Sequence, residues 1–231
     1  MIFGGLQKNS LIDYPGKLSC VLFISGCNFY CPYCHNPDLV KGTPTAPLSE
    51  KSFFDFIQKR KGFLDAVVIS GGEPTLYKEL FPLCRKIKQA GYPVKLDTNG
   101  SRPEIIETLI GENLIDCIAM DIKTEPTRYP TWIQTNCNPA TILSSIRIIM
   151  ESGMDHEFRT TCIKPLVDEQ VIESVSRLIK GAMRYALQKF RNLSEVLRPE
   201  FFLENAFLID DDELLYLKSI AESWVEKCIV R

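Results

Sequence analysis

The sequence has no excess of positive charge and no hydrophobic run long enough to cross a membrane. Lys and Arg number 27 against 29 Asp and Glu, for a net charge of -2, so no basic surface is available for a nucleic-acid backbone or an anionic membrane. The longest strongly apolar stretch, residues 18–27, is well short of the roughly 20 residues that a bilayer requires. Residues 1–16 lack the charged and apolar segments of a secretion signal. We expect a cytoplasmic protein that binds neither DNA nor membrane.

The composition also lacks the biases of disordered, collagen-like or coiled-coil chains. Of the 231 residues, 45% are hydrophobic and 24% are charged, as in an ordinary globular protein. No internal repeat, low-complexity tract or Pro/Gly/Ser-rich linker interrupts the sequence. We therefore predict a single domain over residues 1–231, with a core of about 15–190 and a C-terminal helical extension of about 191–231.

Short apolar runs that favour β-strands alternate with amphipathic segments that favour helices. The expected strands are residues 18–25, 66–70, 93–98, 115–123, 157–164 and 183–190. The expected helices are residues 49–61, 78–90, 103–110, 139–152, 168–180 and 210–228, several of them ending at a glycine. Strands that are apolar on both faces indicate an α/β fold with a parallel sheet covered by helices. An open doubly wound sheet and a partial barrel both fit, and both place ligand chemistry at the carboxyl ends of the strands.

Nine cysteines are many for such a chain, and their number is odd. A disulfide framework would be expected in a short secreted chain with an even number of cysteines. Six of the nine are scattered and are predicted to be small buried apolar residues. These six are Cys20, Cys84, Cys117, Cys137, Cys162 and Cys228. The other three are crowded into one short loop and need a different explanation.

Cys27, Cys31 and Cys34 follow the spacing C-x3-C-x2-C directly after the first expected strand. Three thiolates this close can hold one inorganic cluster or one soft metal ion. Ordinary electron-transfer iron–sulfur clusters take four cysteines, so three leave one iron open, as catalytic metal sites leave a position for substrate. We predict an open-cornered 4Fe–4S cluster. The alternative is structural zinc with His35 as fourth ligand, but such sites use separated ligand pairs, and His35 more simply orients the loop or contacts a ligand.

The cysteine motif, with Tyr33 as the aromatic residue of C-x3-C-x-aromatic-C, resembles the signature of the radical S-adenosylmethionine (SAM) superfamily. Residues 71–74 resemble that superfamily's GGEP motif. The resemblance implies a partial (β/α)6 barrel with a C-terminal helix, a 4Fe–4S cluster on the three cysteines, and SAM as cosubstrate. The CHN sequence at 34–36, DTNG at 97–100 and MDIK at 120–123 resemble the glycyl-radical-enzyme activases. Among these, the segment 5–37 is most similar to the activators of anaerobic ribonucleoside-triphosphate reductase.

The resemblance also implies a set of cofactor-binding residues at the carboxyl ends of the strands. They are Tyr33, His35, Gly71, Gly72, Glu73, Pro74, Asp97, Thr98, Asn99, Asp121, Lys123 and Arg159. Without Cβ atoms, the two glycines let the backbone approach a ligand closely, and in the family this segment binds the amino group of SAM. A glycine pair by itself would more simply be a turn.

The charged members of this set have more than one reading each. By similarity to pyruvate formate-lyase activating enzyme, Asp97, Thr98 and Asp121 would bind a monovalent cation beside the methionyl carboxylate. The carboxylates of Asp97 and Asp121 would equally suit ribose hydroxyl groups or an ammonium group. As an alternative, these two residues are solvated acids at strand ends. Lys123 would pair with the methionyl carboxylate, and Arg159 matches an arginine on the fifth strand of the same enzyme. As an alternative, both are surface charges.

The implied reaction is the one-electron reduction of SAM, followed by hydrogen abstraction from a glycine of a partner enzyme. The electron would come from a flavodoxin- or ferredoxin-type donor. Asp13, in the segment IDYPG, matches the DGPG segment of pyruvate formate-lyase activases and would face the partner's glycine loop near the mouth of the barrel. No second cysteine array is present, so one cluster is expected. Gln188 replaces a histidine of that enzyme, and His156 is expected in an exposed turn.

Two other functions remain open from the sequence. One is a radical SAM enzyme that acts on a small molecule or RNA, which the CHN, DTNG and MDIK segments disfavour. The other is a non-catalytic iron–sulfur protein, which would leave residues 71–74 and 97–100 without a role.

Overall fold

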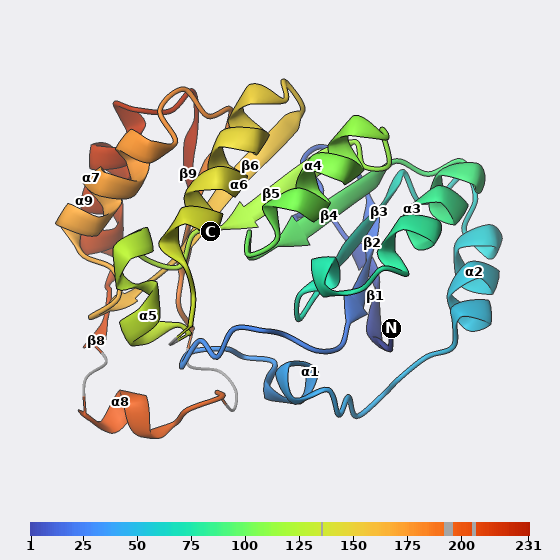
Figure 1. Cartoon of the computed structure of the whole chain (residues 1–231), viewed down its shortest axis with the longest axis horizontal. Coiled ribbons are helices and arrows are strands. Elements are labelled where there is room, and N and C mark those ends of the chain that lie inside the picture. The colour runs from blue at the N-terminus through green and yellow to red at the C-terminus, as the bar shows by residue number, and fades with distance from the viewer. Residues whose placement is uncertain (135, 192–195, 205–206) are drawn as a thin grey trace. The chain divides into compact units, whose positions relative to one another are not determined.

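The computed structural model describes residues 1–134, 136–191, 196–204 and 207–231 (Figure 1). The chain divides into two compact units. The first comprises residues 1–28, 36–98 and 104–118, and the second comprises residues 29–35, 99–103 and 119–231. The central strand β5 (Cys117–Asp121) contributes residues to both units. The single domain inferred from the sequence stays a prediction.

The first unit is built on a short parallel sheet. Strands β2 (Ser19–Ile24), β3 (Ala66–Gly71) and β4 (Val94–Thr98) pair in parallel, with Cys20 opposite Val67 and Val67 opposite Val94. The antiparallel strand β1 (Phe3–Ser10) covers the outer edge of β2. The unit's short connecting helices are α1 (Pro37–Lys41) and the 3-10 turn η1 (Pro74–Leu76). Its longer helices are α2 (Glu50–Lys59), α3 (Leu80–Gln89) and α4 (Pro103–Gly111), whose first residue belongs to the second unit.

The second unit also has a parallel sheet. Strand β6 (Asp155–Lys164) pairs in parallel with β7 (Tyr185–Lys189), which pairs in parallel with β9 (Cys228–Val230). The short strand β8 (Phe207–Leu208) pairs antiparallel with β6. The helical elements are η2 (Pro126–Arg128), α5 (Tyr129–Trp132), α6 (Pro139–Glu151), α7 (Glu169–Leu178), α8 (Glu200–Glu204) and α9 (Asp211–Glu222). Helices α7 and α9 lie side by side (Figure 1).

Helix starts follow from short polar side chains that cap exposed backbone amides. The side chain of Ser49 accepts a hydrogen bond from Ser52 N at the start of α2, and Asp168 accepts one from Val171 N at the start of α7. Asp210 does the same for Glu213 N in α9. Such caps satisfy amides that have no partner within the helix. The six strands and the helices expected from the sequence are present, with ends displaced by a few residues.

Two local expectations are wrong, and one strand was not predicted. The expected helix 210–228 ends at Glu222, and its last expected residue, Cys228, begins strand β9. Strand β1 was not expected, since its sequence FGGLQKNS holds few β-forming residues, and pairing with β2 forms it. His156 is buried in β6 rather than exposed. Its Nε2 accepts a hydrogen bond from Met183 N, and its Nδ1 lies 2.8 Å from Met154 O, so both ring nitrogens have partners inside the fold.

The scattered cysteines largely follow the prediction. Five of them are buried and Cys137 is half-buried. Among the described residues, the longest apolar helices fall short of the length and hydropathy that a membrane-spanning helix needs.

Candidate functional site

The cysteine loop begins at a position that only glycine can occupy. Gly26, directly before Cys27, has a φ of +97°, and a Cβ there would lie 2.1 Å from the hydroxyl oxygen of Tyr77. That hydroxyl donates a hydrogen bond of 2.7 Å to the carbonyl oxygen of Ser25. The chain is thereby turned at the carboxyl end of β2, where parallel α/β folds place their ligands.

The glycine pair at the end of β3 packs on the start of this loop. Gly72 N donates to Ile24 O at 2.7 Å, and Glu73 N donates to Gly26 O at 2.8 Å. A Cβ on Gly72 would lie 2.1 Å from Gly26 O, and Gly71 has a φ of +116°. The two glycines are expected to let the backbone approach a ligand closely. In the structure they let it approach the backbone of Ile24 and Gly26.

Glu73 connects the glycine pair to the neighbouring strand. Its fully buried carboxylate accepts hydrogen bonds through Oε1 from Thr75 N (3.1 Å), Thr75 Oγ1 (2.5 Å) and Thr98 Oγ1 (2.8 Å). Pro74 begins the turn η1 and is buried. Glu73 and Thr98, both expected to bind the cofactor, therefore hold the ends of β3 and β4 together.

Asp97 lies at the end of β4 in a charged pair that the sequence analysis did not anticipate. Its Oδ1 lies 2.5 Å from Nζ of Lys95, and its Oδ2 accepts a hydrogen bond of 3.1 Å from Ser70 Oγ. The Lys95 side chain is fully buried. The signal that would have revealed the pair is a lysine two positions before an acid inside an otherwise apolar strand, since such residues share one face. Asn99 belongs to the second unit, where its Oδ1 accepts from Ser101 N.

Asp121, Lys123 and Arg159 form a charged cluster in the second unit. Arg159 Nε lies 2.6 Å from Asp121 Oδ1, and Lys123 Nζ lies 2.9 Å from Asp121 Oδ2. Burial raises the pKa of Asp121, but the guanidinium and the ammonium groups outweigh burial and hold it well below its usual range. Burial lowers the pKa of Lys123, whereas Asp121 and the nearby Cys31 raise it, and the net shift is upward. Two cations and one anion leave this cluster with a local charge of +1, which suits an anionic ligand.

Tyr33 presents a buried hydroxyl group beside this cluster. Its side chain is buried, and its hydroxyl oxygen has no hydrogen-bond partner among the residues that the structure describes. Burial, followed by the negative charges of Cys31 and Asp121, raises the pKa of Tyr33 well above its usual value. The hydroxyl is therefore protonated at neutral pH. A buried polar atom without a partner is costly, and a bound ligand would remove that cost.

His35 contacts the residues that directly follow β7. Its ring stacks on Phe190 at 4.8 Å with an interplanar angle of 11°, and its Nε2 lies 2.7 Å from Arg191 O. The side chain is otherwise exposed. These contacts favour the expectation that His35 orients the loop, and they disfavour zinc ligation.

Asp13 does not lie at this edge. Ser10 pairs with Ser19 at the start of β2, whereas the cysteine loop follows Ile24 at the other end of that strand. Six residues of extended chain span roughly 20 Å. The segment that contains Asp13 therefore lies at the amino end of β2, because β1 runs antiparallel to it. The expected role of Asp13, facing the partner's glycine loop at the opening of the barrel, stays a prediction.

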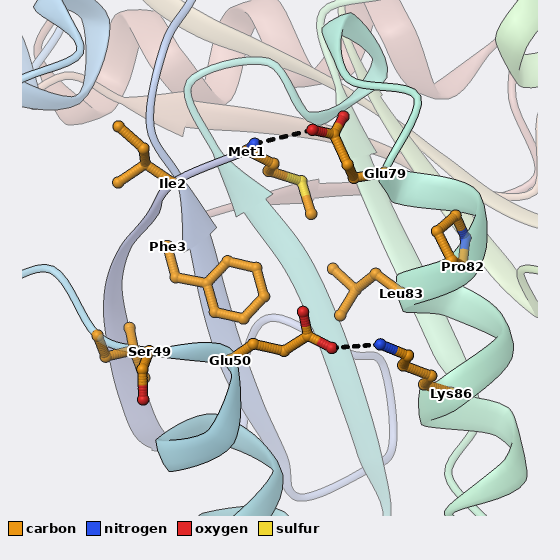
Figure 2. Close-up of a pocket in the computed structure, with 10 residues that line it drawn as sticks. Met1, Ile2, Phe3, Ser49, Glu50, Glu79, Pro82, Leu83 and Lys86 are labelled. Atoms are coloured by element: carbon orange, nitrogen blue, oxygen red, sulfur yellow. Dashed lines mark hydrogen bonds and ion pairs between the residues drawn. The ribbon is translucent and has the colours of Figure 1, made fainter.

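A pocket lies elsewhere in the first unit. It has a volume of about 470 Å³ and lies between the beginnings of α2 and α3, with Phe3 and Leu83 in its walls (Figure 2). Its charges are paired: the amino group of Met1 with Glu79, and Glu50 with Lys86. None of the residues expected to bind the cofactor lines it.

The donor set fits an iron–sulfur cluster. Cys27, in the first unit, and Cys31 and Cys34, in the second, hold reduced thiols rather than disulfides, and thiolates are the ligands that such clusters take. Within the described ranges, no three His, Cys, Asp or Glu side chains are grouped closely enough to hold a single metal ion. In a cluster, by contrast, each thiolate binds a different iron.

Comparison with known proteins agrees with these features. Residues 21–178 match the model of the radical SAM superfamily. A protein of Methanocaldococcus jannaschii that bears the provisional name of a glycyl-radical enzyme activating enzyme is 35% identical over 237 residues, which cover 100% of this chain and 95% of that protein. The pyruvate formate-lyase-activating enzyme of Listeria monocytogenes is 38% identical over 131 residues, or 51% of each chain.

Solved structures share the fold. Streptococcus suis SuiB bound to a precursor peptide matches 91% of this chain with a TM-score of 0.69 at 14% identity. SuiB bound to S-adenosylmethionine matches 88% with a TM-score of 0.63 at 14% identity. This chain spans 48% and 47% of the SuiB chains in those structures. The α/β fold of the radical SAM type expected from the sequence is thus confirmed.

The 4Fe–4S cluster and SAM are the cofactors of this family. The matched motifs, the fold and the full-length relative lead to one conclusion: the chain is an enzyme that belongs to the radical SAM superfamily, in the group that activates glycyl radical enzymes.

Proposed function

We propose that this activase generates the glycyl radical of an anaerobic ribonucleoside-triphosphate reductase, using electrons from a flavodoxin- or ferredoxin-type donor. The observation that supports the proposed partner is the segment 5–37, GLQKNSLIDYPGKLSCVLFISGCNFYCPYCHNP, which resembles the activators of that reductase. The reducing chemistry and the six cysteines outside the cluster loop favour a cytoplasmic location.

The three cysteines have the first proposed part in this activity. Cys27, Cys31 and Cys34 each hold one iron. When bound, the cluster and SAM supply a one-electron reductive cleavage of the C5′–S bond, which releases methionine and yields 5′-deoxyadenosine once a hydrogen atom has been taken from the partner's glycine. The chain's own groups orient the reactants and exclude water, while the cofactors carry the radical chemistry.

The charged cluster supports a position for the methionyl carboxylate. Lys123 and Arg159 present more positive charge than Asp121 neutralises, and Lys123 lies within electrostatic range of Cys31. A carboxylate placed there gains charge-assisted hydrogen bonds close to a cluster ligand. The buried Tyr33 hydroxyl would donate to the same bound molecule.

The glycine segment would receive the amino group of SAM through oxygen atoms. The amide groups of Gly72 and Glu73 already donate to Ile24 O and Gly26 O. An amino group is a hydrogen-bond donor, so it needs acceptors, and the backbone carbonyl groups of residues 71–73 supply them. The segment therefore serves as an acceptor edge rather than as a set of amide donors.

Electron paramagnetic resonance tests the choice of partner. The reconstituted protein is incubated with SAM, reduced flavodoxin and the host's anaerobic ribonucleotide reductase, and in parallel with pyruvate formate-lyase. A glycyl-radical doublet on the reductase alone is expected. A doublet on pyruvate formate-lyase alone would show that pyruvate formate-lyase, and not the reductase, is the partner. Cleavage of SAM without a doublet on any glycyl radical enzyme of the host would favour a small-molecule or RNA substrate.

A further inference from the structure

Lys95 is a buried charge that the chemistry described so far does not use. It lies within β4, its side chain is fully buried, and its Nζ is 2.5 Å from Asp97 Oδ1. Moving an ammonium group out of water costs several kcal/mol unless an opposite charge compensates it. The presence of Lys95 in this strand is therefore tied to Asp97, a residue expected to bind cofactor.

The pair is a property of the strand itself. Lys95 and Asp97 are two residues apart and so point to the same face of the sheet. Ser70, on the neighbouring strand β3, donates to the second carboxylate oxygen of Asp97 at 3.1 Å. Both oxygens of Asp97 thus contact groups of this chain, and the lysine and aspartate charges sum to zero.

This arrangement does not fit the monovalent cation expected at Asp97 and Asp121. A hard cation is held by oxygen ligands that carry negative charge, but the charge of Asp97 is already neutralised by Lys95. Asp121, in the other unit, contacts both Lys123 and Arg159. Neither carboxylate offers the uncompensated charge that would attract a metal cation.

We infer that the ammonium group of Lys95 takes the place of a monovalent cation at Asp97, so that SAM binding by this chain needs no potassium or sodium ion. The inference rests on the proposed use of this edge for SAM. Lys95 is a positioning residue: it acts through Asp97, whose carboxylate it holds and neutralises.

Isothermal titration calorimetry with SAM tests the inference directly. The anaerobically reconstituted protein is titrated in potassium chloride, sodium chloride and choline chloride at equal ionic strength, and equal affinities in the three salts are expected. In Lys95→Met, which keeps the length of the side chain but not its charge, we expect affinity in choline chloride to fall at least about tenfold, or about 1.4 kcal/mol. Potassium should restore part of it. A wild-type affinity that rises tenfold with potassium would overturn the inference.

Thermal unfolding of the cofactor-free protein gives a readout that does not depend on SAM. The wild type should have the same Tm in potassium and choline chloride, whereas Lys95→Met should unfold at a lower Tm because a buried carboxylate loses its partner. Lys95→Met combined with Asp97→Asn should recover much of the loss, since no buried charge remains.

The matched control is Lys88→Met, which breaks the surface pair between Lys88 and Asp116 and should change Tm little. A stable Lys95→Met variant, or a double variant as unstable as the single one, would contradict the pairing. Failure to bind SAM in every salt, with these unfolding results intact, would count against the proposed SAM site and not against the pair.

Discussion

A Cβ atom on Gly72 would lie 2.1 Å from the carbonyl oxygen of Gly26 and 3.3 Å from the amide nitrogen of Cys27. The segment after β3 and the beginning of the cysteine loop are therefore packed backbone against backbone. Any side chain at position 72 must displace the loop that carries the first cluster ligand. The glycine of the GGEP motif therefore holds the beginning of the cysteine loop in place, in addition to its proposed part in binding SAM.

We expect Gly72→Ala to impair cluster assembly and SAM binding together. Displacing a packed backbone costs about 1–3 kcal/mol, and the displaced atoms lead directly into Cys27. Iron content after anaerobic reconstitution and calorimetric SAM affinity are the measurements. Gly111→Ala is the matched control, because a Cβ at that position meets no atom within 4 Å. Full iron loading with weakened SAM binding would show that the loop tolerates the change and that the glycine serves SAM alone.

The cysteine assignment predicts the iron content. Reconstituted protein should bind about four irons per chain, as one cluster requires. Cys34→Ala should lose the cluster and, with it, the cluster's absorbance at visible wavelengths. Cys137→Ala should keep both, because Cys137 is equally half-buried but lies outside the loop. Stoichiometric zinc in protein purified without oxygen, with no iron uptake, would refute the cluster.

His35→Phe should retain the full complement of iron. A phenyl ring preserves the stack on Phe190 and removes only the bond from Nε2 to Arg191 O, so a change in stability of about 1 kcal/mol is expected. Iron content and the urea midpoint report the two effects separately. If iron or zinc is lost in the folded variant, His35 is a metal ligand after all.

The charged cluster around Asp121 predicts a pH dependence of stability. Its pKa is lower in the folded protein than in the unfolded chain, where about 3.9 is usual. The stabilising contribution is therefore complete well above pH 4 and declines as the pH falls below it. Asp121→Asn should cost about 3 kcal/mol at pH 7.

The cost of Asp121→Asn should shrink as the pH is lowered toward 2. Urea unfolding of the wild type and the variant at several pH values measures this difference. A constant difference across the range would mean that the carboxylate acts through hydrogen-bond geometry and not through its charge.

The sequence was informative where one short segment contains the whole signal. Apolar runs such as residues 18–25 predict buried parallel strands, and Ser49 and Asp168 predict helix starts, because the cap and the first turn are local. The C-terminal strand could not be predicted in this way. Cys228 continues the helical spacing of apolar residues in the preceding helix. Only its pairing with Tyr185 on β7 makes it part of a strand.

The candidate site shows the same division. The cysteine spacing and the glycine pair are local motifs and were identified. The surroundings of Asp13 depend on β1, a strand whose own composition does not favour it, and its antiparallel pairing with β2 could not be predicted from the local sequence. Lys95 was missed because a lysine in a β-run is ordinarily an edge or surface residue, and its burial is decided by Asp97 and by the helices that cover the sheet.

By this inference, the residue two positions before Asp97 decides whether the chain needs a potassium or sodium ion from solution. A chain with a lysine at position 95 contains the positive charge that neutralises Asp97, whatever the salt composition of the solution. By the same inference, a variant with a neutral residue at position 95 would need a cation from solution to neutralise Asp97, and its activity would then depend on the potassium concentration. Replacing this one amino acid would thus change an activase that needs no added cation into one whose activity depends on potassium.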